Sequence, residues 1–200
     1  MVEDAALLEF MRAISAGTLV ARSPALAGAQ LTRGGTRANA PDFFLPELRL
    51  QLYAGDTALH VAAAAYNLPL ATSLVAAGAD IRARNRRGAE PLHAATIGNP
   101  VADTWNPQRQ AAMITFLVGV GADPNSPAAG GVTPLHRAVR NRCSAAVRAL
   151  LNAGADPSLA NNNGSTPAAL AEWTTGRGGS GSPEAKAEQA AIVTMLAAHA

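Results

Sequence analysis

The chain has 200 residues, of which 48% are hydrophobic but only 4% aromatic, so any core must be built from Ala, Leu, Val and Ile. Such small side chains pack closely and suit thin stacked layers of helices better than one thick globule. The formal net charge is only +2. No apolar run reaches the roughly 18 residues that a membrane-spanning helix needs, which excludes a membrane protein of that kind.

Residue usage indicates the source and the cellular location of the protein. The basic residues are fifteen Arg and one Lys, a bias that is typical, beside abundant Ala and Gly, of a GC-rich bacterial genome. Cys143 is the only cysteine, so no disulfide can form within the chain. The start is acidic at Glu3 and Asp4, where a secretory signal needs positive charge. These features predict a bacterial, cytoplasmic protein.

The first predicted elements are two short helices. Leu7, Leu8 and Met11 would form one apolar face of the first helix. A turn at residues 16–17 leads to a second helix that is cut short before Pro24.

Residues 32–50 form an irregular segment. They hold three arginines and an apolar cluster at residues 43–45, Phe-Phe-Leu. Two interpretations stay open: the phenylalanines cover an open edge of the helical layers, or they form an exposed anchor for a partner.

Four later segments open with one pattern, in which a glycine is followed by Thr, Pro, Leu and His at fixed offsets. They are Gly55–His60, Gly88–His93, Gly131–His136 and Gly164–Ala169. The first two glycines and the last two are each 33 residues apart, and the middle pair is 43 apart. A second pattern, Gly-Ala-Asp, begins at Gly78, Gly121 and Gly154 in the same phase. The chain is therefore an array of repeats.

Each part of the pattern has a physical reason. A Thr hydroxyl accepts a hydrogen bond from an unpaired N–H at a helix start, Pro at the first helical position loses no donor, and Gly ends a helix in the left-handed conformation. The predicted caps are Thr57, Thr133 and Thr166; the first-position prolines are Pro91, Pro134 and Pro167; the terminating glycines are Gly78, Gly121 and Gly154. Each unit is thus a helix, a turn, a second helix and a hairpin loop.

These motifs resemble the ankyrin repeat, with its G-x-T-P-L-H opening and its G-A-D closing. The resemblance covers about residues 51–200 as four repeats, and residues 4–31 resemble a divergent first repeat. The sequence departs from the pattern at Ala58, Glu90 and residues 168–169, and the last departure suggests a capping repeat.

The resemblance implies an all-α repeat solenoid of about five stacked helix-turn-helix units with hairpin loops. Its concave face, formed by the hairpin tips and the first helices, usually binds other proteins. The expected organisation is a single domain over residues 1–200. Its predicted parts are a divergent repeat at 1–31, an insertion at 32–50, repeats at 51–83, 84–126 and 127–159, and a capping repeat at 160–200.

Two insertions interrupt turns between paired helices, at residues 101–110 and 174–186. Helix layers pack about 8–10 Å apart, so both insertions and the intervening Arg-Asn-Arg turn would emerge on one edge. The predicted partner-binding residues there are Trp105, Arg109, Arg140, Asn141, Arg142, Trp173 and Arg177. The alternative is that the insertions are tolerated surface loops.

A second candidate surface is an arginine-rich hairpin tip. Four arginines crowd residues 82–87, and guanidinium groups bind carboxylate or phosphate in a bidentate fashion. The predicted partner-binding residues are Tyr53, Tyr66, Arg84, Arg86 and Arg87. A solvated charge run is the alternative.

No cofactor or metal site is predicted, because the candidate residues do not meet the structural requirements of such sites. Glycines at 176, 178 and 181 match a dinucleotide fingerprint by letter, but a helix precedes them where a strand is required. His60, His93 and His136 occupy equivalent places in successive layers, too far apart to share one ion, and are expected to bond helix starts to loops.

No catalytic group is predicted. Cys143 and His136 would lie at opposite ends of a helix, beyond the reach that a nucleophile and its base require, and Cys143 is expected to be a packing residue. Asp80, Asp123 and Asp156 are expected to serve turns.

The sequence therefore predicts a non-enzymatic scaffold or regulator that binds a protein partner through the concave face and the inserted loops. The alternative is binding of nucleic acid or another polyanion through the arginine-rich tips, which the small net charge and the single Lys oppose. No cofactor, metal or membrane contact is expected, and the sequence leaves the oligomeric state open.

Overall fold

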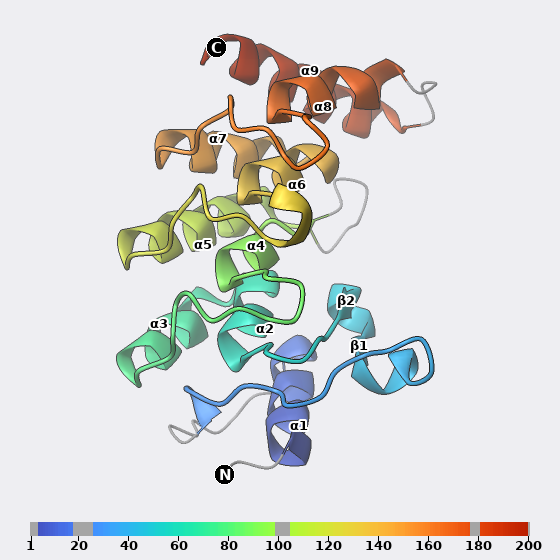
Figure 1. Ribbon diagram of the computed structural model, residues 1–200. Helices are drawn as coiled ribbons and strands as arrows, with labels where there is room; N and C mark the ends of the chain where they lie inside the picture. Colours follow the sequence, from blue (N-terminus) through green and yellow to red (C-terminus); the bar gives the residue numbers. More distant parts are fainter. Residues whose placement is uncertain (1–3, 18–25, 99–104, 177–180, 200) are drawn as a thin grey trace. The chain divides into compact units, whose positions relative to one another are not determined.

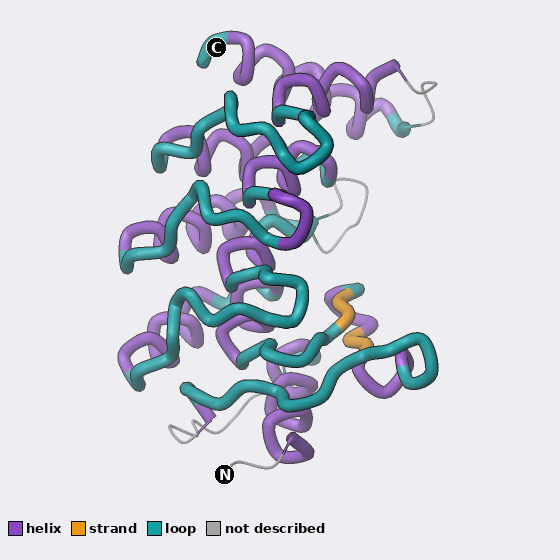
Figure 2. The backbone as a smooth tube through the Cα atoms, viewed as in Figure 1, coloured by secondary structure: helices purple, strands orange, loops and turns teal. Residues whose placement is uncertain are grey.

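A computed structural model describes residues 4–17, 26–98, 105–176 and 181–199. Their contacts group into two compact units, Met1–Ala95 and Thr96–Ala200. Each unit consists of short helices joined by long loops (Figure 1, Figure 2). Across the described residues, no helix is long and apolar enough to cross a membrane.

The first unit is centred on helix α2. Its helices are α1 (Asp4–Ser15), α2 (Ala58–Ala64), α3 (Leu68–Ala76) and α4 (Pro91–Ala95). Helix α2 packs against α1, against α4 and against its own pair α3 (Figure 1). Every residue of α2 is buried, since neighbouring helices cover it on several sides.

The insertion folds into a small lobe of the first unit. It contains the 3₁₀ helices η2 (Ala40–Phe43) and η3 (Pro46–Leu48) and the strands β1 (Phe44–Leu45) and β2 (Leu50–Gln51), which pair antiparallel. Phe43 and Leu45 are buried, whereas Phe44 is 41% exposed. The two interpretations of this cluster therefore each describe part of it: two side chains cover the core and one faces outward.

Polar contacts fasten the insertion to α1. Asp4 accepts hydrogen bonds from the backbone N–H groups of Thr32 and Arg33, at 2.8 and 3.0 Å. Arg12 donates to the carbonyl of Asp42 at 2.7 Å, and the Ser15 hydroxyl donates to a Glu47 carboxylate oxygen at 2.7 Å. The lobe is thus anchored along the length of the first helix.

The second unit stacks two rows of helices. Its elements are α5 (Pro107–Gly119), η4 (Ala129–Gly131), α6 (Pro134–Arg140), α7 (Ser144–Asn152), α8 (Pro167–Gly176) and α9 (Pro183–Ala197). Helix α6 packs against α8, while α7 packs against α5 and α9, and each first helix also packs against its own pair (Figure 1). This is the layered arrangement that a helical repeat requires.

The capping predictions are confirmed. The Thr57, Thr133 and Thr166 hydroxyls accept from the backbone N–H three residues on, and α4, α6 and α8 begin at the predicted prolines. Gly78, Gly121 and Gly154 follow the second helices with φ of 88°, 109° and 87°. The all-α repeat solenoid predicted as the fold class is confirmed by these repeated helix pairs.

The loops between repeats share the same turn contacts. Asp80, Asp123 and Asp156 each accept from a backbone N–H two residues on, as turn-forming aspartates do. Successive loops also bond to each other within a unit: Arg86 N–H donates to the Ala54 carbonyl at 2.6 Å, and Asn162 N–H to the Gly130 carbonyl at 2.9 Å. The backbone of the hairpin loops is therefore held by contacts within each loop and between successive loops.

Candidate functional site

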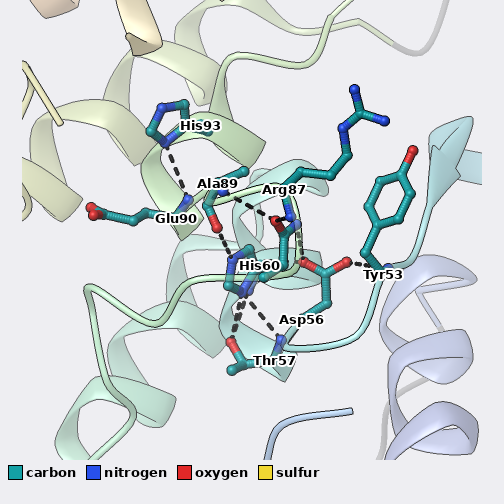
Figure 3. A network of polar contacts seen from close by, with 9 residues as sticks. Tyr53, Asp56, Thr57, His60, Arg87, Ala89, Glu90 and His93 are labelled. Atoms are coloured by element: carbon teal, nitrogen blue, oxygen red, sulfur yellow. Dashed lines mark hydrogen bonds and ion pairs between the residues drawn. The ribbon is translucent and has the colours of Figure 1, made fainter. Parts of the chain in front are cut away.

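Buried histidines join each helix start to the following loop. In the first unit the His60 Nδ1 accepts from the Thr57 N–H at 3.2 Å, and Nε2 lies 3.1 Å from the Ala89 carbonyl (Figure 3). In the second unit His136 makes the same contacts with the Thr133 N–H and the Ser165 carbonyl, at 3.2 and 2.9 Å. The predicted structural role of these histidines is confirmed.

The geometry fixes one neutral tautomer at His136. A carbonyl can only accept, so Nε2 carries the proton and donates to Ser165, while Nδ1 is the acceptor. Burial lowers the pKa of His136, and the bond to Ser165 opposes that shift only in part. The same imidazole cannot be protonated at Nδ1 without losing the bond from Thr133.

Acidification is therefore expected to weaken the second unit through His136. The unfolded chain binds more protons at this group than the folded chain, so the free energy of unfolding falls as the pH drops below about 6.5, by at most about 1.4 kcal/mol per pH unit. Urea denaturation between about pH 8 and pH 5 measures this slope. His136→Asn, whose amide does not titrate, should flatten it; equal slopes in the two proteins would contradict the assignment.

The candidate surface of the first unit is a basic and aromatic cluster at a hairpin tip. We call Tyr53, Arg84, Arg86 and Arg87 the tip cluster. The guanidinium carbons of Arg86 and Arg87 lie 5.5 and 5.4 Å from the centre of the Tyr53 ring, within the range of cation–π attraction. Arg86 and Arg87 of the arginine-rich tip thus contact Tyr53 of the preceding repeat, and their binding of a partner stays a prediction.

Buried carboxylates lie next to the tip cluster. Arg84 Nε donates to a Glu90 carboxylate oxygen at 3.0 Å, and Glu90 is only 2% exposed. Asp56, 3% exposed, accepts from the Tyr53 N–H at 2.7 Å and from the Asn85 side chain at 2.8 Å (Figure 3). Part of the arginine charge is thus neutralised within the protein.

The candidate surface of the second unit lies where paired helices turn. We call Trp105, Arg109, Arg140, Asn141 and Arg142 the edge surface. Trp105 Nε1 donates to Gln110 at 3.0 Å, Gln110 donates to the Ile97 carbonyl at 3.2 Å, and Asn141 donates to the Thr96 carbonyl at 2.9 Å. Residues 96–98 therefore connect the start of α5 with the α6–α7 turn.

Close packing supports the same grouping. A Cβ atom placed on Gly98 would lie 2.6 Å from the Cys143 Sγ and 2.8 Å from the Trp105 Nε1. A Cβ on Gly181 would lie 2.7 Å from an Arg142 nitrogen, so the segment before α9 adjoins the turn as well. Arg109 and Arg140 are exposed on this side of the unit's helices, and Trp105, Asn141 and Arg142 are half-buried.

Three further residues were predicted to bind a partner, and the structure describes the side chain of only one of them. Tyr66 lies in the turn between α2 and α3 with φ of 51°, and it is 8% exposed, so it has little surface to offer a partner. Arg177 lies outside the described residues, as do residues 101–104 of the first insertion. Trp173 lies in α8, and its side chain is outside the described part of the structure.

Two long-range contacts also contribute to these surfaces, and the repeat pattern does not predict them. The Gly35 carbonyl accepts from Arg86 at 2.9 Å, which brings the insertion to the tip cluster. Glu188 of α9 accepts from the Ser144 N–H at 2.7 Å and so caps α7, whose own preceding residue offers no side-chain cap. Both contacts join residues more than forty positions apart, and no local sequence motif predicts them.

The remaining reactive groups are engaged or buried. Burial raises the pKa of the Cys143 thiol to about 12, so it stays protonated at neutral pH. Both ring nitrogens of His136 are occupied by Thr133 and Ser165, as described above. In the part of the chain that the structure describes, no three His, Cys, Asp or Glu side chains gather where they could hold a metal ion.

Comparisons with known proteins agree with this architecture. Residues 54–86 match the ankyrin repeat family, and residues 119–171 match the family of ankyrin repeats in many copies. Over 111 residues, 56% of this chain, the sequence is 34% identical to Ankyrin repeat and SOCS box protein 16 of Mus musculus. The matched region covers only 24% of that relative's length. Ankyrin repeats generally mediate protein–protein interaction, and proteins built from them are generally non-enzymatic scaffolds. The chain is an ankyrin repeat protein.

Proposed function

We propose that this protein is a scaffold or regulator that binds another protein through its hairpin tips, first helices and inserted turns. The proposal is supported by the family and by the geometry of the two surfaces, in which Arg84, Arg86, Trp105 and Asn141 are held by hydrogen bonds within the protein. Pre-organised surfaces of this kind lose little conformational entropy on binding. The bacterial origin and the cytoplasmic location stay predictions.

The edge surface is the observation that carries the proposal. A partly exposed Trp and three Arg lie around the α6–α7 turn, and Trp and Arg are the residue types that dominate the energetics of protein interfaces. Their backbone is fixed by the contacts of Asn141 and Gln110 with residues 96–97. Such a surface suits a protein partner that buries the Trp and pairs with the Arg.

Nucleic-acid binding is the second candidate, and the tip arginines motivate it. The formal net charge of +2 and the single Lys provide few phosphate contacts, and Glu90 pairs with one of the tip arginines. Polyanion binding would weaken steeply with added salt, since each phosphate contact releases a counterion. Protein binding is therefore the better supported of the two.

Affinity capture with the full chain tests the proposal. The tagged protein is incubated with lysate of its source organism that has been treated with nuclease, and the retained proteins are identified and then purified. One protein that binds directly and saturably in the purified state is expected. Retention of nucleic acid alone from untreated lysate, with no direct protein partner, would overturn the proposal.

Substitutions in the edge surface then locate the contact. Trp105→Ala and Arg142→Glu are each expected to weaken binding of the captured partner by about tenfold or more, as loss of an interface anchor does. Arg148→Glu, an equal charge reversal at an exposed site on α7, is the matched control and should leave affinity within about twofold. Calorimetric titration measures the affinities, and circular dichroism checks that each variant is folded. Equal losses in Arg142→Glu and Arg148→Glu would indicate general electrostatics and contradict the assignment.

A further inference from the structure

The tip cluster brings two cations to a single aromatic ring. The guanidinium carbons of Arg86 and Arg87 lie 5.5 and 5.4 Å from the Tyr53 ring centre. The electron-rich ring partly offsets the repulsion between these like charges. An anion seated between them would offset the rest, so the arrangement is poised to bind negative charge.

The cluster is held in place by its surroundings. Arg86 is fixed at both ends, because its N–H donates to the Ala54 carbonyl at 2.6 Å and its guanidinium donates to the Gly35 carbonyl at 2.9 Å. Gly35 is itself held by its N–H bond to the Leu52 carbonyl at 2.8 Å. The Tyr53 N–H is bonded to Asp56. Binding would therefore not have to order these groups, which favours affinity.

Arg87 still has bonding capacity. Its guanidinium contacts the Tyr53 ring, and the described residues provide no hydrogen-bond acceptor for it. Figure 3 shows the Tyr53 hydroxyl and the Arg87 guanidinium extending in the same direction from the loop. A planar guanidinium beside a hydroxyl donor matches the two oxygens of a carboxylate.

Charge in the neighbourhood limits the size of the anion. Arg84 is paired with the buried Glu90, and the buried Asp56 accepts from the Tyr53 N–H, so the positive charge is confined to a small spot. A nucleic acid needs a chain of phosphate contacts, which this spot cannot supply. Single carboxylates carried on a protein segment fit it better.

We propose that Tyr53, Arg86 and Arg87 form a clamp for an Asp or Glu side chain in an acidic segment of the protein partner. This inference rests on the proposed function and adds the chemistry of the segment that is recognised. The guanidinium groups donate to the carboxylate beside the ring, and the Tyr53 hydroxyl donates a further hydrogen bond.

Nuclear magnetic resonance of the isotope-labelled full chain tests the clamp. The chain is titrated with an oligoglutamate peptide at about 0.15 M salt, and the arginine side-chain signals are followed. The largest changes are expected at Arg86 and Arg87. Arg87→Ala should weaken oligoglutamate binding by about fivefold, whereas Arg82→Ala, which removes an equal charge from the same hairpin, should change it less than about twofold. Tyr53→Leu should also weaken binding, and thermal unfolding verifies that each variant folds.

Several outcomes would overturn the clamp. These are no saturable change with oligoglutamate, equal losses in Arg82→Ala and Arg87→Ala, equal binding of oligoglutamine, or tighter binding of an oligothymidylate. None of them touches the capture experiment, in which a protein partner can still bind through the edge surface. Failure of capture and failure of the clamp are thus separate results.

Discussion

Gly55→Ala is expected to destabilise the first unit by about 2–5 kcal/mol. Gly55 has φ of 87°, which is costly for any residue with a Cβ atom. A Cβ at this position would also lie 2.6 Å from the Arg84 carbonyl oxygen and 2.7 Å from the Asn85 Cα, both backbone atoms that cannot turn away. The loops must therefore separate, and the bond from Arg86 N–H to the Ala54 carbonyl would be strained with them. Urea denaturation followed by circular dichroism measures the loss.

Gly78→Ala is the matched control for this prediction. Gly78 has nearly the same φ, 88°, but among the described residues no heavy atom beyond its two chain neighbours lies within 4 Å of the Cβ position. Its substitution should cost only the backbone strain, about 1–2 kcal/mol. The difference between the two variants measures the close approach of the loops. Equal losses would show that loop contact contributes nothing to stability.

The helical repeat could be predicted because its signals are local and recur. A Thr cap, a Pro at the first helical position and a terminating Gly each act within one turn of helix. They can therefore be recognised from the sequence without knowledge of the tertiary structure. Glu90 departs from the Thr of the pattern, yet its N–H still bonds to His93 Nδ1 at 3.2 Å. The backbone contact persists at that position although the capping side chain is different.

The insertion could not be predicted in the same way. Residues 32–50 carry no helical period, and their fold depends on long-range bonds such as those from Thr32 and Arg33 to Asp4. Residue type does not indicate which of the two adjacent Phe side chains is buried. In the β1–β2 pair, successive side chains point to opposite faces. Phe44 consequently faces outward while Leu45 is buried.

The positions of some candidate surface residues could be predicted from the repeat as well. Repeat phase alone assigns Trp105 and Arg142 to helix turns and Arg86 to a loop tip. It does not indicate that Gln110 links Trp105 to the Ile97 carbonyl, or that Arg86 reaches Gly35. These contacts arise from the insertions, where the 33-residue spacing no longer relates one position to the next.

Both surfaces depend on the layers beneath them, since a docking face made of turns and loop tips has no core of its own. In the second unit that support comes from α6, which packs against α7 and α8. Leu135 is 0% exposed and is the second residue of α6. It lies between Thr133, which caps the helix, and His136. Loss of its side chain would leave a cavity at the start of α6, the helix whose other end leads into the turn with Arg140, Asn141 and Arg142.

Leu135→Ala is accordingly expected to destabilise the second unit by about 2–5 kcal/mol, as large-to-small core substitutions do. Leu159→Ala removes the same atoms at a site that is 36% exposed, so it should cost well under half as much. Urea denaturation of both variants measures the free energies of unfolding. Binding of the captured partner, measured at low temperature where both variants are folded, should weaken more for Leu135→Ala because α6, which leads into the α6–α7 turn, is then packed less firmly. Equal stability of the two variants would mean that α6 does not support the layer, and the edge surface would then need another origin for its order.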